Sequence, residues 1–202
     1  MKNIDYEKVI EDLSRKYSIE VAVVKAVQEV ESGNRSGFLS DGRPQILFEG
    51  HVFYKLLKQK YGEDKVQKLA LQYPTLIYKQ WTRVHYLGGL AEHDKRLTPA
   101  AKIDRDCALQ STSFGMFQIM GFNYRACGCD SLQEFVNSMY RSAADQVVLF
   151  FNFINSQGLM VHLRSKNWIA FARAYNGPSY TANNYHNRLK AAYNSYKTRG
   201  VQ

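Results

Sequence analysis

The stretch IEVAVVKAVQEVESG, residues 19–33, carries a strong helical signal and an acid at its end. Val24, Val27 and Glu31 follow one another at spacings of three and four residues, so their side chains share one face of a helix. Gly33 is a suitable end point, because glycine easily takes the left-handed conformation that follows many helices. The stretch therefore predicts a helix with a carboxylate on its inner face, close to its C-terminal end.

The rest of the chain extends this pattern to a mainly α (α+β) fold with a small β element near residues 36–49. Ser18 is expected as the N-cap of the helix just described, with Glu20 in its first turn. Turn residues followed by a short apolar run predict a loop and one or two short strands over residues 34–48. The expected helices cover residues 4–17, 19–32, 51–62, 63–72, 79–93, 98–110, 114–120, 131–156, 165–174 and 183–197.

Length and composition are typical of one globular domain. A chain of 202 residues fits a single domain over residues 1–202 and buries roughly 70% of the surface that its unfolded form exposes. The hydrophobic fraction is 45%, with only 4 prolines and no Ser/Gly-rich stretch. These values favour a packed core without a linker or disordered tail.

No targeting segment or membrane span is expected. The N-terminal sequence MKNIDYEKVIEDLSRKYS is charged throughout and lacks the apolar core of a signal peptide. The longest fully apolar run, residues 147–151, is far shorter than the ~20 residues that cross a bilayer. The sequence thus predicts synthesis in the host cytoplasm, and any exit from the cell would need outside help.

The charge balance is basic, with a net charge of +9 from 27 Lys+Arg and 18 Asp+Glu. Such a surface favours polyanions, which include nucleic acid, anionic lipid and acidic cell-wall polymers. The densest basic stretch, KLLKQKYGEDKVQK at residues 55–68, is more typical of a solvated helix face than of a binding site. Zinc-finger, RRM, KH and basic-zipper patterns are absent, so nucleic acid is not the expected partner.

The three cysteines, Cys107, Cys127 and Cys129, are expected to be reduced and structural. Their odd number argues against a disulfide framework, and the CGC spacing is not that of a redox CxxC pair. A metal site would need a fourth ligand at suitable spacing, and only a distant histidine could supply it. No cofactor and no metal are therefore expected.

Glu31 is the first candidate for chemistry. Burial and the negative end of the helix dipole both disfavour its charged form, so its pKa should be raised. A carboxylic acid that is neutral at working pH can protonate the leaving oxygen in glycoside cleavage. The alternative is that Glu31 reaches solvent at the helix end or pairs with Arg35, and one acid at a helix end leaves this open.

A second acid, Glu49, lies inside the apolar stretch ILFEGHVFY, residues 46–54. A second carboxylate could activate water or stabilise an oxocarbenium-like transition state. The alternative is an ion pair with His51 or Lys55. The pattern by itself leaves both possibilities open.

Three further stretches, in order, resemble a known family. VQEVESG at residues 27–33, SFGMFQIMG at 113–121 and FARAYNGPSY at 171–180 resemble the lysozyme-like superfamily of goose-type lysozymes and lytic transglycosylases. The longer series DGRPQILFEGHVFY, FGMFQIMGFN, FARAYNGPSY and N.Y..RL..AY is more similar to the N-acetylmuramidase family of bacteriophage endolysins. This resemblance extends over residues 20–196.

The resemblance implies a lysozyme-like fold and peptidoglycan as the substrate, cleaved between N-acetylmuramic acid and N-acetylglucosamine. It implies Glu31 as the catalytic acid and Glu49 as the second carboxylate. The residues that it implies for substrate binding are Ser113, Gln118, Tyr175 and Asn176. An amide can hold an N-acetyl group or a hydroxyl, and a tyrosine hydroxyl can hydrogen-bond the acid or the sugar. Local helix capping by Gln118 and a core position for Tyr175 remain alternatives.

Three positions depart from the family pattern. Gln110 stands where an acid is common, Gly50 where a basic residue is common, and Phe114 where tryptophan is common. The two tryptophans, Trp81 and Trp168, could stack on sugars, although a lone tryptophan is more often part of a core. No separate wall-binding module fits in the chain, so the basic surface is expected to attract anionic wall or outer-membrane polymers.

A hydrolase is the favoured function, and a monomer is expected. The alternatives are a lytic transglycosylase that forms 1,6-anhydro-muramic products, a non-catalytic glycan-binding protein, for which Gln110 is the only hint, and a basic nucleic-acid binder. After synthesis in the host cytoplasm the enzyme would reach the wall through a holin or another release system.

Overall fold

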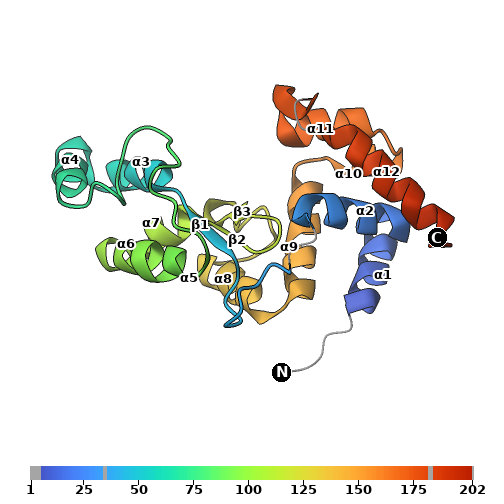
Figure 1. Ribbon diagram of the computed structural model, residues 1–202, viewed down its shortest axis with the longest axis horizontal. Coiled ribbons are helices and arrows are strands. Elements are labelled where there is room, and N and C mark those ends of the chain that lie inside the picture. Colours follow the sequence, from blue (N-terminus) through green and yellow to red (C-terminus); the bar gives the residue numbers. More distant parts are fainter. Residues whose placement is uncertain (1–5, 34–35, 182–183, 202) are drawn as a thin grey trace. The chain divides into compact units, whose positions relative to one another are not determined.

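The computed structural model describes residues 6–33, 36–181 and 184–201. The chain forms two compact units (Figure 1). We call Met1–Ser36 together with Ser142–Gln202 the helical unit, and Gly37–Arg141 the sheet unit. The expectation that residues 1–202 act as one catalytic domain stays a prediction.

The helical unit combines the two ends of the chain. Its core is built from apolar side chains of several helices, among them Val24, Val27, Phe150 and Phe171, which are fully buried. Tyrosine hydroxyls of α12 donate to acids at both ends of α2, Tyr193 to Glu20 directly before the helix and Tyr196 to Glu29 within it, so the last helix runs along the second (Figure 1). Its elements are α1 (Tyr6–Tyr17), α2 (Val21–Ser32), α9 (Ala143–Ser156), α10 (Met160–Arg164), α11 (Trp168–Asn176), η3 (Pro178–Thr181) and α12 (Tyr185–Thr198).

Helix α2 follows the sequence prediction closely at its C-terminal end. Gly33 takes the left-handed conformation, with φ of 57°, and its N–H bonds the carbonyl of Glu29 at 3.0 Å. The prediction for the other end was wrong, because Ser18 is not the N-cap. It adopts φ of 52° in the turn after α1, and Glu20 is the extended residue that precedes α2. The sharp turn between the two helices required a left-handed residue at Ser18.

The sheet unit surrounds a three-stranded antiparallel sheet with the order β1-β2-β3. Ile46 is paired with Phe114, and Ser113 is paired with Met120; the side chains of Ile46, Phe48 and Phe114 in these strands are buried. The strands and helices are β1 (Ile46–Phe48), α3 (Gly50–Tyr61), α4 (Glu63–Gln72), α5 (Gly89–Glu92), η1 (His93–Leu97), α6 (Thr98–Ile103), α7 (Arg105–Gln110), β2 (Thr112–Phe114), β3 (Ile119–Met120), η2 (Gly121–Asn123) and α8 (Leu132–Arg141).

Two predicted helices of this unit are wrong. Within residues 114–120, Phe114 ends β2 and Ile119 and Met120 form β3, and residues 115–118 turn between them, with Gly115 (φ 73°) and Gln118 (φ 50°) in left-handed conformations. Residues 79–88 have no regular structure, and α5 begins only at Gly89. Short apolar runs of this kind do not distinguish a helix from a buried strand by periodicity alone.

Two longer predicted helices are each divided by a capping residue. Asp104 is extended and accepts a hydrogen bond from the N–H of Cys107, which ends α6 and starts α7 within residues 98–110. Ser142 likewise accepts from the N–H of Asp145 and separates α8 from α9 within residues 131–156. The helices predicted over residues 4–17, 51–62, 63–72, 165–174 and 183–197 are present among the described residues as α1, α3, α4, α11 and α12. Residues 4, 5 and 183 lie outside the described residues, and α11 begins only at Trp168.

No helix in the described ranges is both long enough and apolar enough to cross a membrane.

Candidate active site

Glu31 lies in the last turn of α2, where two tyrosines reach its carboxylate. The Tyr185 hydroxyl, at the start of α12, donates a hydrogen bond to Glu31 Oε1. The hydroxyl of Tyr175, near the end of α11, is a second hydrogen-bond partner of the same carboxylate. Three helices of the helical unit therefore position one acid.

The two tyrosine rings are held by aromatic packing. Tyr175 stacks on Phe171 with ring centroids 5.7 Å apart, and on Tyr185 with centroids 6.3 Å apart. Phe150 of α9 meets the edge of Tyr175 at 6.0 Å. A tyrosine ring that is packed in this way loses little further freedom when its hydroxyl binds the acid.

The surroundings of Glu31 raise its pKa to about 7, and burial is the largest cause. The hydrogen bond from Tyr175 and the charge of Arg188 act in the opposite direction. Arg188 lies one turn after Tyr185 on α12 and donates Nη2 to the Val30 carbonyl at 3.3 Å. The raised pKa agrees with the expectation from the sequence; the alternative partner Arg35 lies outside the described residues.

The AYN motif ends α11. Burial and the neighbouring Glu31 carboxylate raise the pKa of Tyr175 well above its ordinary value, so it remains a hydrogen-bond donor at neutral pH. Asn176 is the last residue of the helix, and its side chain lies outside what the structure describes.

Glu49 occupies a different environment, in the sheet unit, directly before α3. Its Oε2 accepts a hydrogen bond from the Tyr86 hydroxyl at 2.7 Å, and His51 Nδ1 lies 3.3 Å from the same oxygen. Its N–H donates to the carbonyl of Ser111, which ties it to the start of β2. The hydrogen bond from Tyr86 therefore fixes the direction of the Glu49 carboxyl group.

Ser113 and Gln118 form a polar pair on the β2–β3 hairpin. Ser113 is 4% exposed, and its Oγ donates to Gln118 Oε1 at 2.9 Å. The Gln118 amide nitrogen donates to the carbonyl oxygens of Gly115 at 2.8 Å and Gln45 at 3.4 Å. These bonds fix the side chain in its turn, and Oε1 can still accept one more hydrogen bond. Ser113 thus holds the Gln118 amide in its orientation.

Comparison with known proteins places this arrangement in a family. A model of N-acetylmuramidases matches residues 20–197. The chain belongs to the N-acetylmuramidase family.

The crystal structure of a Burkholderia AP3 phage endolysin is similar over 95% of this chain and 71% of the endolysin chain, at 38% sequence identity and a TM-score of 0.86. No curated protein sequence matched. This muramidase therefore has the mainly α, lysozyme-like fold expected from its motifs. It is a glycoside hydrolase whose substrate is peptidoglycan.

The muramidase accommodates two of its departures from the family pattern by packing. A Cβ atom on Gly50 would lie 2.5 Å from the carbonyl oxygen of Leu76 and closer still to the ring of Tyr78, so a larger side chain has no room there. Phe114 is fully buried and meets Phe135 edge-on at 5.8 Å. Gln110, the third departure, is the last residue of α7 and is half-buried.

Several residues around the two acids were not predicted as site residues. Tyr185 and Arg188 are both in the N.Y..RL motif, whose spacing of three places them on one helix face, but nothing in the sequence connects them to Glu31. Tyr86 lies in a segment that was predicted as a helix. The structure also contains an ion pair that was not predicted. Arg96 Nη1 lies 2.8 Å from Glu92 Oε1, and both residues are buried.

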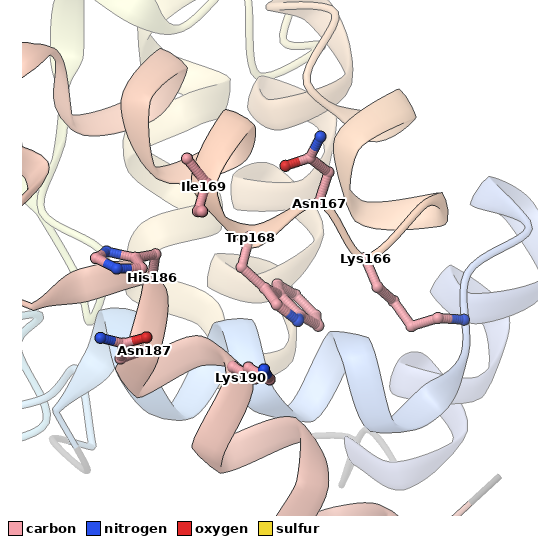
Figure 2. A pocket seen from close by; sticks show the side chains of 7 residues that line it. All are labelled: Lys166, Asn167, Trp168, Ile169, His186, Asn187 and Lys190. Carbon is pink, nitrogen blue, oxygen red and sulfur yellow. The ribbon is translucent and has the colours of Figure 1, made fainter.

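The muramidase has a pocket of about 310 Å³ beside α11 and α12, lined by Lys166, Asn167, Trp168, Ile169, His186, Asn187 and Lys190 (Figure 2). None of the predicted site residues lines it. The Lys166 ammonium points away from Trp168 and is paired with Glu20 at 2.6 Å. Trp168 is 8% exposed and packs 5.5 Å from Tyr193, so it belongs to the core.

The three cysteines are buried, and none of them forms a disulfide in the described part of the chain. Burial raises the pKa of Cys107 and of Cys127 to about 12 and that of Cys129 to about 11, which keeps these thiols protonated. Within the described ranges no group of three or more His, Cys, Asp or Glu side chains is arranged to hold a metal ion.

Proposed function

We propose that this muramidase cleaves the β-1,4 bond between N-acetylmuramic acid and N-acetylglucosamine, with Glu31 as the general acid. One observation carries the proposal: burial raises the Glu31 pKa to about 7, while two tyrosine hydroxyls orient its carboxyl group. An acid with that pKa is largely protonated below neutral pH and can still release its proton to a substrate.

The reaction begins when the Glu31 carboxyl group transfers its proton to the glycosidic oxygen. The bond between that oxygen and the anomeric carbon of muramic acid breaks, and the electron pair leaves with the oxygen. The new Glu31 carboxylate then accepts hydrogen bonds from Tyr175 and Tyr185, and the positive charge of Arg188 stabilises it. These groups favour the charged form that the proton transfer creates.

Glu49 is proposed as the second carboxylate. Its bond from Tyr86 holds one oxygen in place, and a carboxylate so oriented can accept a proton from the attacking water or face the developing positive charge at the anomeric carbon. The ion pair with His51 is the alternative role, and the 3.3 Å approach is compatible with it. Substitution separates the two, since catalysis requires the charge on Glu49 and not the imidazole.

Gln118, Tyr175 and Asn176 are proposed to contact the glycan, and Ser113 to orient the Gln118 amide. Beyond the active site, the charge of +9 supports attraction to anionic wall or outer-membrane polymers. We propose that the enzyme acts as a monomer in an endolysin role, made in the host cytoplasm and released to the wall by a holin or a similar system. Neither nucleic acid nor a membrane is proposed as a partner.

Mass spectrometry of the muropeptides released from purified peptidoglycan tests the proposal. The wild type should release fragments with reducing muramic ends, and Glu31→Gln should lower the rate by about 10²–10⁴-fold, the usual contribution of a general acid. Glu29→Gln is the matched control, because Glu29 lies two residues earlier on the same helix and bonds Tyr196 rather than the two tyrosines around Glu31. Its activity should stay at the wild-type rate.

The products distinguish the alternatives. Anhydro-muramic ends would assign the chain to the lytic transglycosylases, in which the 6-hydroxyl of muramic acid attacks in place of water. Glycan binding without release of fragments by the wild type would leave a wall-binding protein. Equal activity of the wild type and Glu31→Gln would remove Glu31 from its role as the acid.

A further inference from the structure

The loop of residues 73–88 in the sheet unit has no helix or strand, yet buried polar side chains hold it in place. The carboxylate of Glu92, which is fully buried, accepts the N–H of Leu87 at 2.9 Å. Arg96 donates Nη2 to the carbonyl of Thr75 at 3.2 Å, near the other end of the loop. The loop is therefore anchored at both ends to one buried ion pair.

This anchored loop presents an aromatic side chain to solvent. Trp81 is 57% exposed, whereas large aromatic residues are usually mostly buried. The guanidinium carbon of Arg83 lies over the indole ring, 5.4 Å from its centroid. A cation over one face restricts the motion of the indole and leaves the remaining surface available to a ligand.

A chain of hydrogen bonds connects Trp81 to Glu49. The Trp81 side chain bonds the Tyr86 hydroxyl, and that hydroxyl donates to Glu49 Oε2 at 2.7 Å. The indole N–H is only a donor, so the hydroxyl accepts from Trp81 and gives its own proton to the carboxylate.

We propose that Trp81 is a stacking platform for one N-acetylated pyranose of the glycan strand, which it holds beside Glu49. The proposal rests on the proposed function, since the sugar is part of the strand that the enzyme cleaves. The hydrogen-bond chain through Tyr86 supports this choice of ligand, because it ties the platform to the second carboxylate rather than to a separate surface.

The chemistry of the ligand fits an exposed indole. A β-linked pyranose has a face of C–H bonds that is apolar, while its hydroxyl and N-acetyl groups point outward from the ring edge. An aromatic ring can cover that face without removing the polar groups from water. Arg83, whose guanidinium can donate from its edge, can bond an acetyl oxygen or a carboxylate of the stem peptide.

Intrinsic fluorescence gives a direct measurement, because the chain has only 2 tryptophans and Trp168 is buried. The probe is the hexamer of N-acetylglucosamine, titrated into Glu31→Gln so that it is not cleaved. Binding should change the intensity and shift the emission to shorter wavelength, and both changes should disappear in Glu31→Gln/Trp81→Phe. Calorimetry with the same hexamer should show Kd at least tenfold higher for Trp81→Ala, and a smaller increase for Trp81→Phe, which keeps an aromatic ring.

The matched control is Ile169→Ala, since Ile169 is a large apolar residue with the same 57% exposure on the helical unit. It should leave Kd and the fluorescence change unaltered. Thermal unfolding of every variant checks that the fold is intact. Equal Kd values for the hexamer with Glu31→Gln and with Glu31→Gln/Trp81→Ala would overturn the proposal. A sedimentation coefficient that changes on Trp81→Ala would also overturn it, because the loop would then be a contact between two copies of the chain.

Activity on peptidoglycan separates this proposal from the proposed function. An active wild type together with an unimpaired Trp81→Ala would reject the stacking platform alone. An inactive wild type that still binds the hexamer through Trp81 would reject the proposed hydrolysis and leave the platform standing.

Discussion

Tyr185 hydrogen-bonds the carboxylate of Glu31 from a position 154 residues further along the chain. The bond joins the first residue of α12 to the last turn of α2. The hydroxyls of Tyr185 and Tyr175 orient the Glu31 carboxyl group, while burial disfavours its charged form. Tyr175 therefore affects both the orientation of the carboxyl group and its pKa, whereas Arg188 acts on the pKa through its charge.

The stability of the wild type should depend on Glu31 between pH 4.5 and pH 7. The pKa of Glu31 is about 7 in the folded protein against an ordinary value of 4.5, so the folded state binds this proton more tightly than the unfolded state. The associated stability is complete below pH 4.5 and is lost as pH rises to about 7. At full loss it amounts to about 3 kcal/mol.

Residue 31 does not titrate in Glu31→Gln. The melting temperature of this variant minus that of the wild type should therefore increase from pH 4.5 to about pH 7 and stay constant at higher pH. Calorimetric melting of both proteins at half-unit pH steps measures the difference. A difference that is constant from pH 4 to pH 8 would contradict the raised pKa.

Arg188 should set the alkaline limit of activity. Its positive charge lowers the pKa of Glu31, opposing the larger effect of burial. Arg188→Gln should therefore keep Glu31 protonated to higher pH and move the falling limb of kcat/KM toward alkaline pH. Lys190→Gln, which removes a charge two residues later on α12, is the control and should leave the limb in place. A limb that moves toward acid pH in Arg188→Gln would reject this role.

Glu49→Gln should lower the hydrolysis rate by about 10²-fold or more, because an amide of the same size cannot take a proton from water. Tyr86→Phe should have a smaller effect, since it removes the hydrogen bond that orients Glu49 and leaves the charge. His51→Asn should retain most of the activity. Release of muropeptides from purified peptidoglycan measures all three, and an unimpaired Glu49→Gln would return Glu49 to its role as an ion-pair partner.

Gly50→Ala should destabilise the protein by at least about 2 kcal/mol, because its methyl group would overlap the Leu76 carbonyl and the Tyr78 ring. The Tyr78 hydroxyl also accepts the N–H of Gly50 at 3.3 Å, so the two segments cannot separate without losing this bond. Urea unfolding gives the free energy. Lys55→Ala, at an exposed position of the same helix, should change it by less than about 0.5 kcal/mol.

The loop of residues 73–88 shows where local sequence information was insufficient. A helix was predicted from residue 79, yet Glu92 and Arg96 bind the backbone of the loop instead. Both side chains are distant from most of the loop in sequence, and their effect depends on burial of the pair. The helix predicted over residues 114–120 was wrong for the same reason. A short apolar run there becomes a strand only when β1 is available to pair with β2.

The sequence by itself determined the helix that carries Glu31, the glycine that ends it, and the family motifs. The helix and its glycine depend on residues within one or two helical turns, and the motifs depend on the order of residues along the chain. Only the tertiary structure decided which groups meet the two acids: Tyr175, Tyr185 and Arg188 at Glu31, and Tyr86 at Glu49. The physical reason is that burial and hydrogen bonding act through space, so a pKa and an orientation depend on side chains that the order of residues leaves far apart.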